Sequence, residues 1–269
     1  MNPLDLQKAA LRGEPSHVWR AGQERRLSMI REAAGERLHG RVLVDGCGVG
    51  TYVAHLRQET DAHKELNYER RPEGQEVHGL DIEYDRVLEG LRRYGLELLV
   101  TAAGESLPYP SGCFDLVLSH EVIEHVQDDR AAVAEMIRVL RSPDLASGQP
   151  GGRIVLFCPN RWYPVETHGV YWRGRYRFGN VPLINYLPDP VRNRLAPHVR
   201  AYTGRGLRRL FEGLPVRIVR RTIIFGGYDN LIAHAPRMGP LICAGVRLAE
   251  KTPLRVMGLS HLLVAEKTL

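Results

Sequence analysis

The sequence VLVDGCGVGT at residues 42–51 decides the fold of this 269-residue chain. Val42–Asp45 is a short apolar run of the kind found in buried strands, and Gly46, Gly48 and Gly50 follow it. Glycine adopts positive φ angles without strain and lets backbone N–H groups approach a ligand closely. A helix that begins directly after the loop adds unpaired N–H groups. The G-x-G-x-G spacing differs from the G-x-G-x-x-G of dinucleotide-binding loops.

An acidic residue ends the next predicted strand, Val77–Asp81. A carboxylate at this place can accept hydrogen bonds from both hydroxyl groups of a ribose. We therefore expect Asp81 to bind an adenosine-containing ligand. The alternative is that Asp81 only caps the helix that begins near Tyr84. The 31 residues from Gly50 to Asp81 exceed the ~20 of dinucleotide-binding units, and we interpret the polar stretch Glu59–Glu76 as a surface loop.

Strand-like and helix-like patterns alternate along the chain. The predicted strands are Val42–Asp45, Val77–Asp81, Leu96–Val100, Phe114–Ser119, Arg153–Cys158, Val216–Phe225 and His261–Glu266. The predicted helices run through Val53 and Leu56, Tyr84–Leu91, Val133–Leu140 and Leu207–Leu214. This βαβ alternation predicts a mostly parallel sheet with helices on both faces, and ligands bind such sheets at the carboxyl ends of the strands.

Two segments interrupt the alternation in what we expect to be a single domain, residues 1–269. Residues 159–203 are rich in proline, aromatic residues, arginine and glycine, and residues 226–260 are partly amphipathic. Both are too long for ordinary connections, and long inserts are usually lids or binding elements.

Composition and charge limit the classes of function. The chain is 43% hydrophobic and 25% charged, which excludes a disordered or collagen-like protein. The net charge is +6, and the segment Arg161–Arg209 alone has ten arginines against Glu166 and Asp189. A positive charge in one segment predicts an anionic substrate, a nucleic acid or an acidic membrane surface as partner. A solvated arginine-rich face is the alternative.

Cysteine spacing and terminal composition indicate the compartment. The four cysteines are far apart and form no CxxC pair, so we expect reduced thiols rather than zinc ligands or disulfides. The N-terminal stretch Met1–Leu11 lacks the apolar core of a signal peptide, and about 18 consecutive apolar residues occur nowhere. The expected location is the cytoplasm, with peripheral contact at the membrane surface as an extension.

Further motifs follow in a set order. They are AGESLPY at 103–109, FDLVLS at 114–119, EVIEHV at 121–126, RVL at 138–140 and PGG at 150–152. Together with the glycine loop and Asp81, they resemble the class I S-adenosylmethionine-dependent methyltransferases, above all the group that contains the quinone-biosynthesis methyltransferases. The resemblance covers residues 40–160 firmly and the later strands more loosely.

The resemblance implies a Rossmann-like α/β fold and S-adenosylmethionine as cofactor. In this family a seven-stranded sheet has the order 3-2-1-4-5-7-6 with the last strand antiparallel. The residues implied to bind the cofactor are Asp45, Gly46, Cys47, Gly48, Gly50, Asp81, Ile82, Gly104, Glu105 and Ser119. The family's usual loop acid lies two positions before the first glycine, where this chain has Val44. Strand alternation would turn Asp45 to the other face unless the strand ends earlier.

Three ionisable residues follow the fourth predicted strand. If a helix begins here, Glu121, Glu124 and His125 share one face and could bind Mg²⁺ or Zn²⁺, as a similar segment does in some methyltransferases. A divalent metal is therefore a possible further cofactor, but we favour a reaction that does not need one. We expect His125, Glu121 or His120 to accept a proton from the substrate, because imidazole titrates near neutrality.

The sequence thus predicts methyl transfer to a small or lipid-linked acceptor, at a hydroxyl oxygen. Arginines alternate with aromatic residues in 159–203, a pattern that suits stacking on bases, a lid, a membrane-surface element or a structural cover. RNA methylation is therefore one alternative. An NAD-dependent oxidoreductase and a non-catalytic adenosine-ligand binding protein are two others. The oligomeric state is left open.

Overall fold

The computed structural model describes residues 19–57, 76–227 and 239–269. Met1–Leu11, residues 59–75 of the predicted surface loop and residues 228–238 of the second insert lie outside the described residues. Glu76, the last residue of the predicted loop, instead begins a strand.

The helices are α2 (Ala21–Ala34), α4 (Tyr84–Tyr94), α5 (Asp129–Val139), α6 (Asp189–Leu195), α7 (Gly204–Arg209) and α9 (Gly239–Ala249). Three 3₁₀ helices are η1 (Gly35–His39), η2 (Ile184–Tyr186) and η3 (Pro253–Met257). The strands are β1 (Arg41–Asp45), β2 (Glu76–Asp81), β3 (Leu99–Thr101), β4 (Leu116–His120), β5 (Arg153–Pro159), β6 (Val165–Glu166), β7 (Val170–Trp172), β8 (Arg175–Arg177), β9 (Val181–Pro182), β10 (Val216–Ile224) and β11 (Ser260–Lys267). Residues 51–57 are also helical.

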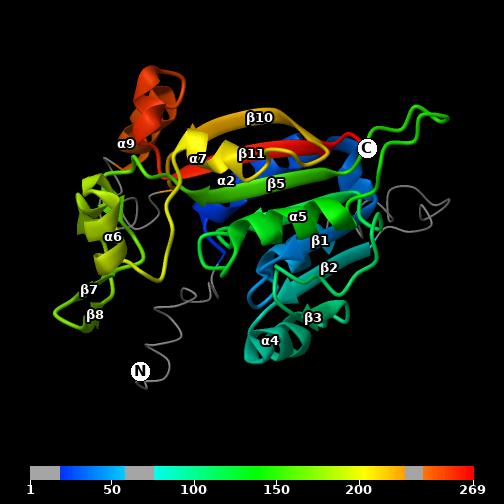
Figure 1. Ribbon diagram of the computed structural model, residues 1–269, viewed down its shortest axis with the longest axis horizontal. Helices are drawn as coiled ribbons and strands as arrows, with labels where there is room; N and C mark the ends of the chain where they lie inside the picture. Colours follow the sequence, from blue (N-terminus) through cyan, green and yellow to red (C-terminus); the bar gives the residue numbers. More distant parts are fainter. Residues whose placement is uncertain (1–18, 58–75, 228–238) are drawn as a thin grey trace. The chain divides into compact units, whose positions relative to one another are not determined.

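A seven-stranded sheet with the order β10-β11-β5-β4-β1-β2-β3 organises the fold (Figure 1). β1, β2, β3, β4 and β5 pair in parallel. At the end of β11, Lys267 N–H donates to Gly152 O before β5, and Thr268 N–H donates to Pro215 O before β10. β11 therefore runs antiparallel to both neighbours. Since β10 and β11 are the sixth and seventh strands of this sheet, the predicted order 3-2-1-4-5-7-6 is confirmed.

The central strands are buried because their apolar runs have no polar face. Leu116, Val117 and Leu118 of β4 and Ile154–Cys158 of β5 are fully buried. Two predicted elements are displaced: β3 begins at Leu99 rather than Leu96, and α7 ends at Arg209, before most of the predicted apolar positions. Helix α5 begins as expected, since Asp128 Oδ1 accepts the Ala131 N–H at 2.9 Å.

The chain divides into two compact units. The described residues of the larger unit are 19–57, 76–157, 210–221 and 262–269, and those of the smaller one are 158–209, 222–227 and 239–261. Each unit is described by itself below. The predicted first insert, 159–203, is folded: β6 pairs with β9, β7 pairs with β8, and η2 and α6 follow.

Candidate active site

The glycine loop follows β1 and has three left-handed residues. Gly46, Gly48 and Gly50 have φ angles of 68°, 58° and 80°. A Cβ atom on Gly46 would collide with Val122, and one on Gly50 would collide with Leu96. No atom of the described residues lies within 4 Å of the place where a Gly48 Cβ would stand. Gly46 and Gly50 are therefore needed for packing, whereas Gly48 borders open space.

Asp81 links the loop to the end of β2. Its Oδ2 accepts the Gly48 N–H at 2.8 Å, and its Oδ1 accepts the Glu83 N–H at 2.9 Å. The second bond supports the entry into α4, so the capping role named above is present. A carboxylate has four lone-pair sites and can accept several hydrogen bonds at once. Both roles are thus compatible in one residue.

Asp45 ends β1 and is buried between neighbouring strands. Ser119 Oγ donates to Asp45 Oδ2 at 3.4 Å, and a Cβ on Gly104 would lie 3.2 Å from Asp45 Oδ1. Oδ1 has no hydrogen-bond partner among the described residues. Burial raises the pKa of Asp45 to about 7, and the charges of Asp81 and Glu105 act in the same direction. The side chain at position 45 therefore lies with Ser119, Gly104 and Asp81.

The other implied cofactor residues lie around this cradle. Ile82 directly follows Asp81 and is 50% exposed although apolar. The Cys47 N–H donates to Leu80 O, and burial raises the pKa of the Cys47 thiol strongly. The charge of Glu105 lies close enough to raise the pKa of Asp45. The Oε1 atom of Glu105 accepts the Gln127 N–H at 2.7 Å.

At the end of β4, an arginine from α2 contacts two of the expected catalytic residues. Arg26 Nη1 lies 2.6 Å from His120 Nε2 and 3.1 Å from Glu121 Oε1. Burial and then Arg26 lower the pKa of His120 to about 3, so this imidazole is neutral and accepts the Arg26 N–H. The Arg26 guanidinium also lies over the ring of Phe157, 5.7 Å from its centroid.

The segment after β4 is a series of turns, which corrects the helix considered for residues 121–125. Glu121 has a φ of 57°, a strained value for a residue other than glycine, and the His125 N–H donates to Val122 O. Glu124 is buried, and its oxygens have no hydrogen-bond partner among the described residues. Burial and the nearby Glu121 charge raise its pKa well above the ordinary value. His125 Nε2 lies 3.9 Å from Glu124 Oε1.

Sequence reasoning missed the side chains that complete this end of the site. Trp19 stacks on His55 with ring centroids 3.6 Å apart and meets Tyr52 edge-on at 5.3 Å. The Tyr52 ring lies 5.0 Å from His120. Tyr52 directly follows the glycine loop and could have been found from its position there. Arg26 and Trp19 precede the motif region, where nothing in the sequence distinguishes them.

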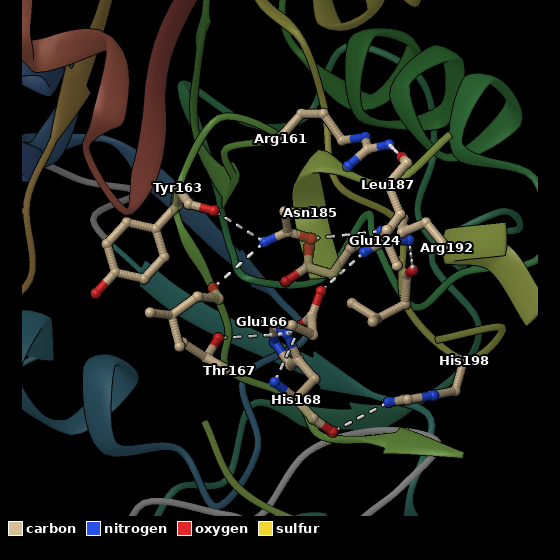
Figure 2. A network of polar contacts seen from close by, with 12 residues as sticks. Glu124, Arg161, Tyr163, Glu166, Thr167, His168, Asn185, Leu187, Arg192 and His198 are labelled. Atoms are coloured by element: carbon tan, nitrogen blue, oxygen red, sulfur yellow. Dashed lines mark hydrogen bonds and ion pairs between the residues drawn. The ribbon is translucent and has the colours of Figure 1, made fainter. Parts of the chain in front are cut away.

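Within the smaller unit, a buried ion pair organises the first insert (Figure 2). Glu166 Oε2 accepts from Arg192 at 2.9 Å, and Glu166 Oε1 lies 3.0 Å from His168 Nδ1. Burial alone would raise the pKa of Glu166, but His168 and Arg192 outweigh it and the pKa is lowered. Asn185 donates to the carbonyl oxygens of Tyr163 and Val165. The insert is therefore a folded element with polar contacts of its own.

The charge of the first insert is partly neutralised inside it. Its two acidic residues are paired, Glu166 with Arg192 and Asp189 with Arg161. Arg173, Arg175 and Arg177 are exposed near the β7–β8 turn. The positive patch that could contact a ligand is therefore smaller than the sequence suggested.

A hollow of about 510 Å³ lies at the opposite end of β1 from the glycine loop. Arg37, Arg41, Asp115 and Arg141 are among its lining residues. Arg37 pairs with Glu266, and Arg141 pairs with Asp115. Parallel sheets bind ligands at the carboxyl ends of their strands, so we place the active site at the glycine loop and not at this hollow.

The strand order, the glycine loop and the acid after β2 together define a class I S-adenosylmethionine-dependent methyltransferase fold. Residues 43–145 match the model of the family described as methyltransferase domain. Residues 43–145 therefore resemble a methyltransferase domain, and the whole chain spans less than a third of the length of one of the curated relatives it matches.

Comparisons with known proteins agree. A 103-residue segment, 36% of this chain, is 36% identical to 31% of the length of ajmaline N-methyltransferase from Rauvolfia serpentina. A longer match, 27% identical, covers 68% of this chain and 74% of demethylmenaquinone methyltransferase from Beutenbergia cavernae. A crystal structure of an S-adenosylmethionine-dependent methyltransferase from Mesorhizobium loti aligns with 92% of this chain and 98% of its own chain. The TM-score is 0.58 and the sequence identity is 17%. That likeness shows the fold.

The residues present fit the cofactor that this class uses. The buried Asp45 Oδ1 has no hydrogen-bond partner within the part of the chain that the structure describes, and the α-ammonium group of S-adenosylmethionine is a suitable donor. The open space beside Gly48 leaves room for the ligand, and Asp81 lies at the end of β2, where a carboxylate can bind ribose hydroxyls. None of the described helices is long and apolar enough to cross a membrane.

Proposed function

We propose that this chain transfers the methyl group of S-adenosylmethionine to a hydroxyl oxygen of a small or lipid-linked acceptor. The observation that carries the proposal is the position of β4. Ser119 contacts Asp45 in the cofactor cradle, and the next two residues, His120 and Glu121, begin the acid–base cluster. One strand end therefore joins the proposed cofactor site to groups that can receive a proton.

Each group has a proposed task. When bound, S-adenosylmethionine supplies a methyl group already activated by its sulfonium, so proximity and alignment provide most of the catalysis. Asp45, Asp81 and the glycine loop hold the cofactor. The acceptor hydroxyl must lose its proton, and His125 or Glu121 takes it. His120 is engaged by Arg26, and we assign to it the positioning of that arginine.

The first insert is proposed to select the acceptor. It follows β5, which ends at the ligand-binding edge of the sheet. Trp172 and Phe178 are half-exposed and flank the exposed Arg173, Arg175 and Arg177 in the sequence. The relatives are named for different acceptors, demethylmenaquinone in one and ajmaline in the other. The demethylmenaquinone relative, which is covered more fully, supports a quinone-like acceptor here.

The test measures transfer of radiolabelled methyl from S-adenosylmethionine to matched acceptors. A hydroxylated quinone is compared with its amine analogue and with its O-methylated form. Label should enter the hydroxylated compound alone. Label on the amine, or on carbon of the O-methylated form, would contradict oxygen as the acceptor atom. Tight S-adenosylhomocysteine binding with no turnover on any acceptor would indicate a binding protein, and NAD binding would indicate an oxidoreductase.

Metal dependence is tested in the same assay. We expect turnover to survive a chelator, because Arg26 already holds the Glu121 carboxylate that a metal would need. Loss of turnover with recovery on Mg²⁺ or Zn²⁺ would instead make Glu121, Glu124 and His125 candidate ligands.

RNA is the second candidate acceptor, favoured by the exposed arginines at 173, 175 and 177 beside exposed Trp172 and Phe178. RNA contact should weaken steeply with salt. Replacing the three arginines with glutamine tests whether they select the acceptor or instead support the fold or the cofactor site. Turnover lost with S-adenosylhomocysteine binding intact supports an insert that selects the acceptor, whereas loss of both places the arginines in the fold or the cofactor site.

A further inference from the structure

Helix α9 of the smaller unit presents an apolar face to solvent. Leu241, Ala244, Gly245 and Leu248 are all exposed, and their spacing of i, i+3, i+4 and i+7 puts them on one side of the helix. Leu241 is 73% exposed and Leu248 is 65% exposed. An ordinary surface helix turns such a stripe toward the core. Here the stripe points away from it.

The other side of α9 is the one that packs. Cys243 is buried, and its Sγ lies 3.8 Å from Gly227 O. The carboxylate of Glu250, just beyond the helix, accepts the Phe225 N–H at 2.7 Å. The helix is therefore fixed within its unit by one side, and its orientation exposes Leu241 and Leu248.

The 3₁₀ helix η3 continues the exposed apolar surface. Leu254 is 60% exposed, and Val256 and Met257 are also exposed. Residues 241–257 hold six of the nineteen large hydrophobic side chains that are exposed among the described residues. Single exposed hydrophobic residues are ordinary, but a cluster of this kind marks an interaction surface.

The charge next to this surface has one sign. Arg247 in the last turn of α9, Lys251 in the turn that follows and Arg255 in η3 are all exposed, so each exposed apolar element has a basic residue within it or next to it in the sequence. Glu250 is the one acidic residue in 239–258, and its carboxylate is bonded to the Phe225 N–H. Long basic side chains can bury their stems in an apolar layer and keep the charge in water. An apolar face with a basic edge is complementary to an anionic lipid surface.

We infer that α9 and η3 form a peripheral membrane-docking surface for anionic phospholipid bilayers. Leu241 and Leu248 would enter the boundary between headgroups and acyl chains, while Arg247, Lys251 and Arg255 contact lipid phosphates. This surface lies outside the cofactor cradle, so the inference does not depend on which acceptor is methylated.

The experiment is co-sedimentation of the full chain with vesicles at physiological salt. Vesicles of phosphatidylcholine with phosphatidylglycerol are compared with vesicles of phosphatidylcholine alone. The protein should bind the anionic vesicles, and the double variant Leu241→Ser/Leu248→Ser should reduce the partition coefficient by at least about tenfold. Arg247→Gln/Lys251→Gln/Arg255→Gln should remove the preference for anionic lipid. Binding of S-adenosylhomocysteine in each variant checks that the protein is folded.

Two controls keep the test specific. Leu145→Ser removes another exposed leucine and should leave vesicle binding unchanged. The variant with Arg173, Arg175 and Arg177 replaced by glutamine should also bind. The inference is overturned if the wild-type chain does not sediment with anionic vesicles, or if only the insert arginines matter. It is also overturned if light scattering shows a lipid-free dimer that Leu241→Ser/Leu248→Ser converts to monomer, since the patch would then join two copies.

Discussion

Arg26 and Glu121, 95 residues apart in the chain, form an ion pair of 3.1 Å in which the same Arg26 nitrogen also contacts His120. The interaction joins α2 to the end of β4. Arg26 adds to the effect of burial in lowering the pKa of His120, and Glu121 has a left-handed conformation with a φ of 57°.

Replacing Arg26 with glutamine should raise the pKa of His120, because one of the two causes of its lowering is removed. The pKa should stay below the ordinary value, since burial is the larger cause. NMR titration of the histidine ring measures this directly, without an acceptor. Arg26→Lys should behave more like the wild type. A wild-type His120 that titrates near pH 6.5 would contradict the assignment.

Asp81→Asn should weaken S-adenosylhomocysteine binding by about 1–3 kcal/mol, the range for hydrogen bonds to a charged group. The amide has one acceptor oxygen, so it cannot serve Gly48, Glu83 and a ribose together. Calorimetric titration measures the loss. Asp85→Asn, on the exposed first turn of α4, is the matched control and should bind normally. Equal affinity in Asp81→Asn would remove this residue from the site.

Gly48 and Gly35 provide a matched pair of glycine variants. Both have positive φ angles, 58° and 56°, and in neither would a Cβ come within 4 Å of another atom of residues 19–57, 76–227 and 239–269. Substitution by alanine should therefore lower the unfolding free energy of both proteins, by about 1–2 kcal/mol for the left-handed helical region and by more at Gly35, whose ψ is −141°. Only Gly48→Ala should also lose S-adenosylhomocysteine affinity, because its Cβ would enter the ligand space. Comparable ligand affinity in the two variants would place the cofactor elsewhere.

The raised pKa of Asp45 predicts how ligand binding depends on pH. With a folded pKa of about 7 against an ordinary 3.8, the folded protein retains a proton that the unfolded chain releases, so the Asp45 contribution to stability falls between about pH 4 and 7. The ligand's ammonium group favours the ionised carboxylate. Affinity for S-adenosylhomocysteine should therefore rise from pH 5.5 to 7.5, by at most about tenfold per pH unit. Asp45→Asn should abolish this rise, and a flat wild-type profile would refute the contact.

Two ion pairs of the first insert should differ in their contribution to its stability. Glu166→Gln leaves Arg192 buried without its counter-charge, which costs about 3–5 kcal/mol. Asp189→Asn breaks a pair whose carboxylate is 79% exposed, which costs under about 1 kcal/mol. Limited proteolysis should cut Glu166→Gln within 159–203 much faster than Asp189→Asn. Similar cleavage rates would mean that the buried pair does not hold the insert together.

The strand order could be predicted because each strand has a local signal and the family resemblance supplies the order. Val42–Asp45 and Arg153–Cys158 are apolar runs followed by glycine or proline. The direction of the Asp45 side chain was harder to predict. Strand alternation would turn this side chain to the other face of the sheet unless the strand ended earlier. Its side chain lies beside Ser119 because Asp45 is the last residue of β1 and pairs in register with Ser119.

Long-range polar partners could not be predicted. Arg26 lies in an ordinary amphipathic stretch, and its contact with His120 exists only once α2 and β4 are assembled. The turn at Glu121 was mistaken for a possible helix because the spacing of residues 121, 124 and 125 fits one helical face. Spacing cannot report the positive φ of Glu121. Likewise, the pairing of Glu166 with Arg192 depends on the fold of the insert rather than on any local pattern.

The position of β11 affects how the protein can be made in the cell. This strand lies between β5 and β10, and Glu266 near its end bonds Arg37 and Arg153. The ribosome synthesises β11 after the six other strands of the sheet. The edge of β5 that pairs with β11 therefore stays unpaired until translation has passed residue 267. Exposed strand edges of this kind promote aggregation. The sheet therefore closes only after β11 has been synthesised.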